Sequence, residues 1–321
     1  MGEQGTVGSK FFGGGMWPAL SSSEWEPTRE TLHRWTQIVG KIRMAYAPAL
    51  NHWWHVALYV DARGLTTSLF PTPAGGLEMA FDFIDHQLVV RRTDGATRTI
   101  GLYPRSVADF YAETTGRLAE LGVSPRIVPR PVEVVDATPF AEDTHHGAYD
   151  ADAAQRFWRQ LLDGSRVCSA FRSSFIGKAS PVHFFWGSFD LAVTRFSGRT
   201  APRHPGGAPN CPDWVMREAY SQEVSSAGFW PGGPREGASY SYAYPEPDGY
   251  RDAVLGPTEA SYDEQLGEFV LPYTAVRTAA DPDGTLAAFL QTTYAAAADR
   301  AGWDRAALEV TADYWPGRRV D

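Results

Sequence analysis

Two stretches of sequence decide the fold: Asn51-His52-Trp53-Trp54-His55 and Pro181-Val182-His183-Phe184-Phe185-Trp186. Each joins a histidine to consecutive aromatic residues, at a point where a helical pattern gives way to an extended one. Ile38-Val39-Gly40-Lys41 precedes the first stretch, and Phe175-Ile176-Gly177-Lys178 precedes the second. Because similar segments at matched positions indicate a repeated unit, we interpret the chain as two diverged copies of one unit.

The patterns around these stretches predict a helix, an antiparallel meander and a further helix in each half. Apolar residues recur at helical spacing over Thr28–Tyr46, and short alternating segments fill Val56–Leu102. A second helix is expected from Ser106, a good N-cap, followed by an isolated strand near Arg126–Val135. The second half repeats this order from a helix near Asp150, with longer Pro/Gly-rich insertions.

The expected fold is α+β, with two pseudo-repeated antiparallel sheets that are each flanked by helices on one face. A Gly-rich leader at residues 1–16 is expected to be flexible. The first half is expected at 17–148 and the second at 149–321, packed as one globular unit. A cavity is expected between the halves, because sites commonly form at such junctions.

The composition disfavours nucleic-acid-binding, membrane-spanning and secreted proteins. The net charge is -9 and the basic residues are scattered, so a nucleic-acid partner is not expected. The chain has no 18-residue apolar run and no secretory signal, and its isolated Cys168 and Cys211 favour a reducing compartment. We therefore expect a cytoplasmic protein without a membrane partner; its oligomeric state stays open. The 11 Trp, 14 Tyr and 17 Phe residues suit a large core or an aromatic-lined pocket.

Several strings of the sequence together resemble a family of uncharacterised bacterial proteins, filed as a domain of unknown function. These strings are Trp35–Lys41, Asn51–Val56, Ala62–Ser68, Phe81–His86, Pro181–Leu191 and Ser226–Gly233. The resemblance runs from about Trp17 to Glu309 and implies a stand-alone bacterial domain. It brings no established activity and no catalytic residues.

The spacing of His52 and His55 leaves a metal site open. Residues three apart share a face on a helix but point to opposite faces on a strand, and this segment lies between the two. A metal would need a further ligand, for which His33, His183 or Asp82 is available, and a two-histidine, one-carboxylate iron site is the type that fits. The alternative is that these histidines hydrogen-bond to buried backbone or carboxylates.

Asp190 is a second candidate, because it lies in the apolar run Phe189–Val193 and needs a partner if it is buried. Arg195 or Arg172 can supply that partner, in which case the pair can be purely structural. Alternation predicts that Phe184, Trp186, Ser188 and Asp190 share one face of the sheet.

Other residues form polar or aromatic rows. His33, Gln37 and Lys41 follow one another at four-residue steps on the first helix, where they face either solvent or the cavity. Tyr240, Tyr242 and Tyr244 are aligned on one strand, where they line a pocket or cover a sheet edge.

These observations predict an enzyme that acts on a small organic substrate by histidine-based acid–base chemistry in an aromatic-lined cavity. The expected catalytic residues are His52, His55, His183 and Asp190. The expected substrate-binding residues are Trp53, Trp54, Tyr59, Trp186, Arg195 and Trp230. The alternatives are a non-enzymatic binder of a hydrophobic ligand and a non-haem metal oxygenase with His52, His55 and His183 as ligands. No cofactor is predicted. The nucleotide-binding glycine motifs and the GxSxG elbow are absent, which disfavours nucleotide-dependent transfer and serine hydrolysis of the common types.

Overall fold

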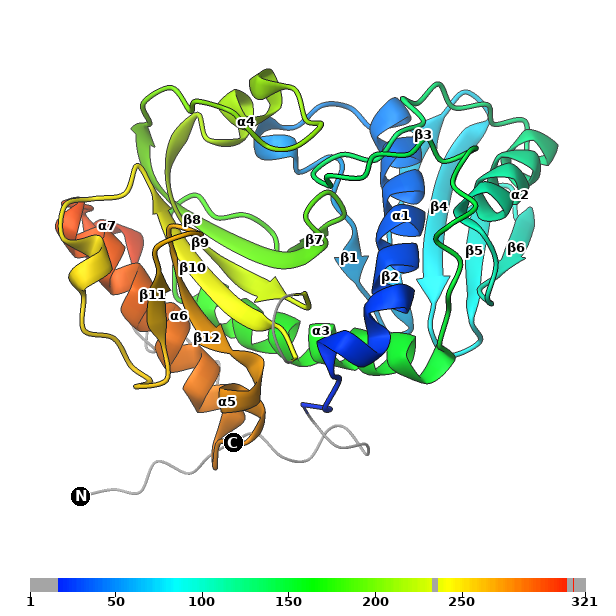
Figure 1. Cartoon of the computed structure of the whole chain (residues 1–321). Helices are drawn as coiled ribbons and strands as arrows, with labels where there is room; N and C mark the ends of the chain where they lie inside the picture. Colours follow the sequence, from blue (N-terminus) through cyan, green and yellow to red (C-terminus); the bar gives the residue numbers. More distant parts are fainter. Residues whose placement is uncertain (1–16, 233–235, 311–313, 315–321) are drawn as a thin grey trace.

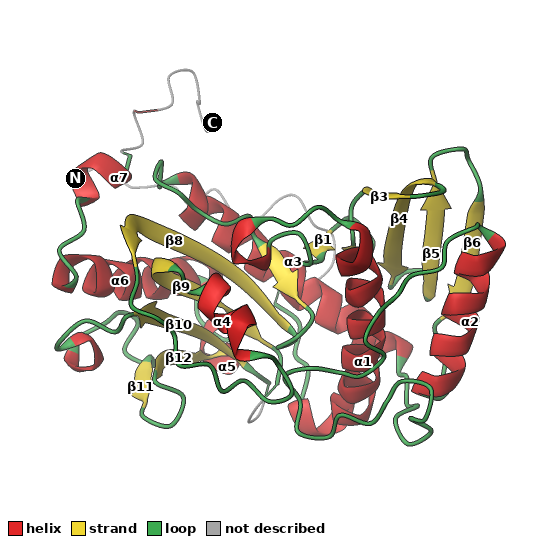
Figure 2. Ribbon diagram, turned by 90° about the horizontal axis from the view of Figure 1, so that it is seen from above, coloured by secondary structure: helices red, strands yellow, loops and turns green. Residues whose placement is uncertain are grey.

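A computed structural model describes residues 17–232, 236–310 and 314, so the expected flexible leader at 1–16 lies outside the described residues. The described chain is an α+β protein with two antiparallel sheets, as the sequence predicts. The sheets stand on either side of a long helix, α1, which Figures 1 and 2 both show between them. None of the helices in the described part of the chain is long and apolar enough to cross a bilayer.

The first half consists of α1, a meander and a second helix. In chain order its elements are α1 (Ser22–Tyr46), η1 (Asn51–Trp53), β1 (Tyr59–Val60), β2 (Gly64–Thr66), β3 (Phe70–Thr72), β4 (Gly75–Asp82), β5 (Gln87–Arg92), β6 (Thr97–Gly101) and α2 (Val107–Glu120). The strands pair in the order β1-β2-β4-β5-β6, and β3 also pairs with β4. Ser106 caps α2 by accepting a hydrogen bond from the Asp109 backbone N–H, as its sequence predicts.

The second half again places a long helix before a meander. Its elements are α3 (Ala151–Ser173), β7 (His183–Phe185), β8 (Asp190–Thr200), α4 (Asp213–Ala219), β9 (Gln222–Trp230), β10 (Ala238–Tyr244), η2 (Tyr250–Asp252), β11 (Ser261–Asp263), β12 (Glu268–Pro272), α5 (Tyr273–Arg277), α6 (Pro282–Arg300) and α7 (Arg305–Leu308). The strand order is β11-β12-β10-β9-β8-β7. Helices α3 and α6 lie against one face of this sheet, and α4 lies over the other (Figures 1 and 2).

The two sheets meet at their edges. Leu58, just before β1, forms an antiparallel bridge with Phe184 of β7. The Leu58 N–H donates to Phe184 O at 2.9 Å, and the Phe184 N–H donates to Leu58 O at 2.7 Å. Each of the two aromatic stretches that mark the repeat therefore leads into the edge strand of its own sheet, and these edges join the halves.

Helix α1 is buried on all sides over its central part. Every residue from Thr31 to Arg43 is buried, including the polar row of His33, Gln37 and Lys41. A helix that is surrounded in this way has no solvent face, so its polar side chains must face other parts of the protein. The polar row consequently faces the interior and not solvent.

Two expectations about local structure are wrong. No strand forms at Arg126–Val135, because this part of the segment 123–150 crosses α1 in irregular conformation and makes no ladder. In addition, a tight turn between β7 and β8 interrupts the alternation, so Phe185 pairs with Asp190 and Phe184 pairs with Leu191. Opposed residues of an antiparallel pair share a face, so Phe184 and Asp190 lie on opposite faces.

Candidate functional site

The second sheet has one apolar face and one polar face. The apolar face packs on α3 and α6 and carries residues such as Leu191, Phe229 and Leu271. The opposite face, here called the tyrosine face, carries Asp190, Ala192, Thr194, Ser226, Gly228, Tyr240, Tyr242, Tyr244 and Glu268. Residues beyond α4 cover part of it, since the hydroxyls of Tyr220 and Tyr242 lie 2.8 Å apart. A polar row expected from the sequence, Tyr240 to Tyr244, is thus placed on a covered sheet face.

Asp190 is held in place on the tyrosine face by two hydroxyl groups. It is 5% exposed, and its carboxylate accepts hydrogen bonds from Ser188 Oγ and Tyr240 Oη. Gly228 allows the second bond, because a Cβ at that position would lie 2.6 Å from the Tyr240 hydroxyl oxygen. The strand register and this glycine therefore direct the tyrosine ring across β9 to Asp190.

Glu133 reaches the same region from the crossing segment 123–150. Gln37 of α1 binds the preceding residue at both ends, accepting from the Val132 N–H and donating to Val132 O, each at 2.8 Å. The Glu133 N–H donates to Pro209 O at 2.7 Å. Glu133 has a φ of 58°, a left-handed conformation that costs free energy in a non-glycine residue and persists only where its surroundings enforce it.

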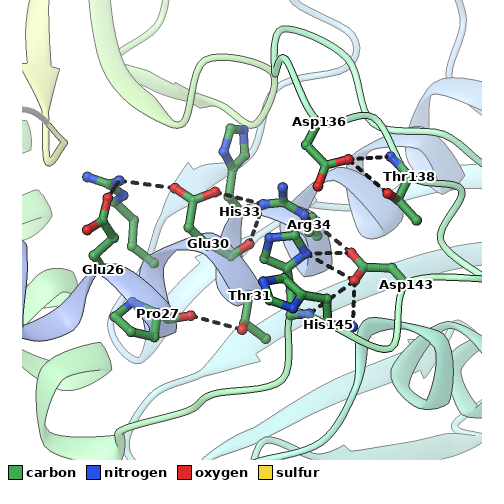
Figure 3. Close-up of polar contacts among 12 residues, drawn as sticks. Glu26, Pro27, Glu30, Thr31, His33, Arg34, Asp136, Thr138, Asp143 and His145 are labelled. Carbon is green, nitrogen blue, oxygen red and sulfur yellow. Dashed lines mark hydrogen bonds and ion pairs between the residues drawn. The ribbon is translucent and has the colours of Figure 1, made fainter.

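An ion-pair network fixes the same segment to α1 further along the chain. Arg34 is 3% exposed and lies between Glu30 at 2.8 Å and Asp143 at 3.3 Å (Figure 3). Asp143 also accepts from the backbone N–H groups of His145 and His146. Breaking such a buried network is costly, so the segment that carries Glu133 has a fixed path over α1.

The Glu133 carboxyl group lies against the backbone that leads to Asp190. A Cβ on Gly187 would lie 2.2 Å from Glu133 Oε1. His33 of α1 bonds to the same residue, with its Nε2 2.8 Å from Gly187 O. Two residues of the polar row on α1, His33 and Gln37, therefore position the two chain segments that bring Glu133 and Asp190 together.

Lys41, the third residue of that row, lies beside the same group. Its side chain is buried, with the residue 2% exposed, and its Nζ lies 5.5 Å from the centroid of the Trp186 ring. The ring packs directly on Gly40, where a Cβ would come within 2.1 Å of the indole nitrogen. The indole N–H donates to Val56 O at 2.8 Å. Gly40 thus lets Trp186 pack on α1 and lie next to the lysine.

These groups form what we call the carboxyl–lysine cluster: Lys41, Glu133, Asp190, Tyr240 and Glu268. Burial raises the pKa of Asp190, against the hydrogen bonds from Ser188 and Tyr240, which lower it. Burial and the Asp190 charge raise the pKa of Glu133 to about 7, while Lys41 acts in the opposite direction. Burial, Asp190 and Asp263 raise the pKa of Glu268 to about 7. The carboxyl groups of Glu133 and Glu268 can therefore gain and lose a proton near neutral pH.

The expected catalytic residue His52 lies at the other end of the tyrosine face. Its Nδ1 is 2.8 Å from Ala219 O, its Nε2 is 2.6 Å from Lys178 Nζ, and its ring packs on Phe196 of β8. Phe196 is six residues from Asp190 along β8, or roughly 20 Å at the rise of a strand. Both ring nitrogens of His52 thus have partners, Nδ1 at the end of α4 and Nε2 at Lys178, and both contacts are far from Asp190.

Trp53, Trp54 and His55 lie at this distant end, and Tyr59 lies in β1 of the first sheet. His55 accepts from the Leu50 N–H at 3.1 Å, and the Trp53 indole donates to Val215 O at 3.0 Å. The ring of Trp54 lies under the Lys178 ammonium, and that of Tyr59 lies under the Arg43 guanidinium. His55 was expected to be catalytic and the other three residues to bind substrate. The structure brings Trp53 and His55 together, with ring centroids 5.3 Å apart, and shows no contact between these four residues and Asp190 within the described part of the chain.

His183 shares the tyrosine face with Asp190, since it pairs with Ala192. It is 1% exposed, neither ring nitrogen has a hydrogen-bond partner among the described residues, and burial lowers its pKa to about 4. Within the described residues, no three His, Cys, Asp or Glu side chains are grouped as ligands for one metal ion. The set of His52, His55 and His183 considered for a metal therefore does not converge.

Arg195, one of the two arginines considered as a partner for Asp190, does not pair with it. It points to the apolar face, where its guanidinium lies 3.5 Å from the Phe171 ring centroid and 4.3 Å from that of Tyr294. Positions five apart on a strand face opposite ways, which separates it from Asp190. Trp230 ends β9 and is 38% exposed, whereas Trp186 lies in the carboxyl–lysine region.

Sequence reasoning missed Glu133 and Glu268 and left Lys41 undecided. Glu133 lies in a run that alternates like a strand, and only the structure shows that it crosses α1. Glu268 could have been found, because it stands two residues from Val270 on a strand beside the tyrosine row. The row His33, Gln37 and Lys41 was visible, and its burial is the feature that the sequence could not settle.

Together these features define a class: an α+β protein of two edge-joined antiparallel sheets with a carboxyl–lysine cluster on one sheet face. A family model described as a family of unknown function, DUF5996, matches residues 17–310, and the chain belongs to this family. No curated protein matches the chain. No solved structure matches it either.

Proposed function

We propose that this protein is an enzyme that transfers protons to and from a small organic substrate at the carboxyl–lysine cluster. The acid–base groups are carboxyls, with Glu133 as the residue that exchanges a proton. Asp190, which is fixed by hydrogen bonds from Ser188 and Tyr240, stabilises positive charge that develops on the substrate beside it. The proposal keeps the expectation of an enzyme that acts on a small organic substrate, and it assigns the acid–base role to Glu133 in place of the histidines.

One observation carries the proposal. Three carboxyl groups come from three separate segments, the crossing segment, β8 and β12, and the charge of Asp190 raises the pKa of both Glu133 and Glu268. The buried Lys41 lies close enough to Glu133 for the two charges to act on each other. Of the three carboxyl groups, Glu133 and Glu268 make no ion pair within the described residues, although Arg side chains elsewhere pair with most buried or half-buried acids. Uncompensated acids with pKa values near neutrality are typical of catalytic sites, because a general acid–base group works best near the operating pH.

The histidines are less suited to this role in the arrangement described. His52 and His55 use ring nitrogens in contacts with backbone or Lys178. Burial lowers the pKa of His183 to about 4, which keeps it neutral near pH 7. His183 can therefore shape the tyrosine face as an uncharged ring, while proton exchange is assigned to the carboxyl groups.

The compartment proposed is the cytoplasm of a bacterium. Cys168 and Cys211 are both free thiols, which supports a reducing environment.

The test is a search for turnover with the whole chain. Purified protein is incubated with a pooled mixture of small metabolites at pH 7, and mass spectrometry follows which compounds disappear and which form. We expect wild-type protein to convert at least one compound, and Glu133→Gln and Asp190→Asn to slow that conversion by about 10²-fold or more, since general acid–base groups contribute about 10²–10⁴-fold.

Glu142→Gln is the matched control, because Glu142 is an exposed carboxyl group on the same crossing segment. It should leave the conversion unchanged. The proposal fails if compounds bind without being converted, or if Glu133→Gln and Asp190→Asn, shown by circular dichroism to be folded, convert them as fast as wild type.

A further inference from the structure

The chain uses lysine sparingly. Of its 29 Lys and Arg residues only three are lysines: Lys10, Lys41 and Lys178. Lys178 has partners, with its Nζ 2.6 Å from His52 Nε2 and 3.1 Å from Gln222 Oε1. Lys10 lies outside the described residues. Nearly all positive charges of the chain are arginines, so the buried Lys41 on the central helix α1 is an exception.

Lys41 has no hydrogen-bond or ion-pair partner among the described residues, and its Nζ lies 5.5 Å from the centroid of the Trp186 ring. A buried ammonium group without a partner costs free energy. If this position needed only a positive charge, an arginine paired with a carboxylate would be the more stable choice. Glu133 and Cys211 are close enough for their charges to act on Lys41, yet neither pairs with it. The arrangement brings an unpaired amine next to a carboxyl group that can hold a proton.

The amine is also able to lose its proton. Burial lowers the pKa of Lys41 to about 8, against the effects of Cys211 and Glu133, which raise it. A substantial fraction is then the neutral amine near pH 7.5, whereas arginine stays charged. A desolvated lysine with a lowered pKa is a nucleophile of the kind that attacks carbonyl carbon.

We propose that Lys41 forms an imine with the carbonyl group of an uncharged aldehyde or ketone substrate. This rests on the proposed proton-transfer function of the cluster and names the class of its substrate. An uncharged compound is specified because Glu133, Asp190 and Glu268 would repel a carboxylate-bearing one when they are ionised.

The chemistry balances with the residues present. The lone pair of Lys41 Nζ forms a bond to the carbonyl carbon, and the carbonyl π electrons move to oxygen, which takes up the proton that the nitrogen loses. Glu133 then donates a proton to this hydroxyl, which leaves as water when the C=N bond forms. The protonated imine acidifies the adjacent C–H bond, and the Glu133 carboxylate produced in the previous step takes up that proton. Addition of water reverses the sequence and frees the amine.

Reductive trapping tests the inference on the intact protein. The protein is incubated at pH 7 with propionaldehyde, and separately with hydroxyacetone, in the presence of sodium cyanoborohydride, and peptide mass spectrometry locates the added mass. Burial lowers the pKa of Lys41 from 10.5 to about 8, which leaves roughly three-hundredfold more free amine at pH 7 than an ordinary lysine has. Burial also lowers the pKa of Lys178, although the charge of Glu218 raises it. We expect Lys41 to carry at least about tenfold more adduct than Lys178, at a rate that saturates with probe concentration.

Lys41→Arg should abolish the saturable labelling, and Lys178→Arg, the matched control, should keep it. Adducts confined to Lys10, Lys178 and the N-terminus of wild-type protein would overturn the inference. This outcome is measured on wild-type protein alone, so it does not depend on whether a variant folds. Loss of metabolite conversion in Glu133→Gln with no adduct at Lys41 would also overturn it, while the proton-transfer function would stand. Labelling of Lys41 with unchanged conversion in Glu133→Gln would support the imine and refute the carboxyl assignment.

Discussion

Asp190 and Glu133 differ in what holds their carboxyl groups. Asp190 accepts two hydroxyl donors, from Ser188 and Tyr240, and is therefore fixed in orientation. Glu133 has a fixed backbone, but no hydrogen bond to its carboxyl group is found among the described residues. A fixed acid beside an acid free to exchange its proton is the division of roles that the proposed function requires.

Glu133→Gln should change the way in which stability depends on pH. The folded pKa of about 7 lies above the ordinary value of 4.5, so the folded chain binds this proton more tightly than the unfolded chain. The contribution of the Glu133 proton to the free energy of unfolding is fully present below pH 4.5. It is lost as pH rises through about 7, and the loss is up to about 3 kcal/mol. The variant does not show this loss, so it should match wild type near pH 4 and exceed it at pH 8 in urea unfolding experiments.

Glu142→Gln, on the same segment, should show the same pH dependence as wild type. An equal difference between Glu133→Gln and wild type at pH 4 and pH 8 would contradict the raised pKa of Glu133.

Tyr240→Phe should weaken the protein by about 1–3 kcal/mol, because it removes a hydrogen bond to a buried carboxylate. It should also raise the pKa of Asp190 further, since the Tyr240 hydroxyl lowers that pKa. Urea unfolding measures the first effect. Tyr244→Phe is the control from the same strand and face, because the Tyr244 hydroxyl donates only to Pro202 O at 3.1 Å. Equal losses in the two variants would count against a special role of Tyr240.

At the scale of elements, helix α1 organises the site. His33 contacts the Gly187 carbonyl, and Gln37, one turn further on, binds Val132. Lys41, on the next turn, supplies the amine of the carboxyl–lysine cluster. The crossing segment and the β7–β8 turn have little regular structure of their own, so their positions depend on this helix. Burial of a polar row on α1 is therefore explained by the site that it builds.

The contact between α1 and the β7–β8 turn depends on Gly40. A Cβ there would come within 2.1 Å of the Trp186 indole nitrogen, so Gly40→Ala should displace the ring and cost about 1–3 kcal/mol through overpacking. Gly116→Ala on α2 is the matched control, because nothing lies within 4 Å of its added Cβ. That change should stabilise the helix by up to about 1 kcal/mol. Thermal unfolding measures both, and a stabilised Gly40→Ala protein would contradict the packing described.

For the whole molecule, the repeat seen in the sequence corresponds to a repeated order of long helix, meander and further helix. Local patterns were sufficient for this, because periodicity and turn residues act over a few positions, as in Gln87–Arg92 and the Tyr240–Tyr244 row. The face on which Asp190 lies was not predictable, since it depends on how tightly the chain turns after Phe185. Glu133 was missed because its position depends on distant partners, Gln37 and Pro209.

The two halves should not fold separately. Helix α1 is buried from Thr31 to Arg43, and it contacts the first half through Trp35 and Phe110 and the second through His33 and Gly187. Expressed alone, residues 17–148 and 149–310 should each give poorly dispersed amide NMR spectra and no cooperative thermal transition, because each would expose a large apolar surface. A well-dispersed spectrum from either piece would contradict this view of one folding unit.

The most direct test of the account is a titration of the Glu133 carboxyl group in the full chain by ¹³C NMR, with Glu133→Gln used for assignment. We predict a midpoint near pH 7, caused by burial and the neighbouring Asp190 charge. In Asp190→Asn the midpoint should fall, because a negative neighbour has been removed. A midpoint for wild type at the ordinary value of 4.5, unchanged in Asp190→Asn, would contradict the claim that these carboxyl groups form a proton-transfer site.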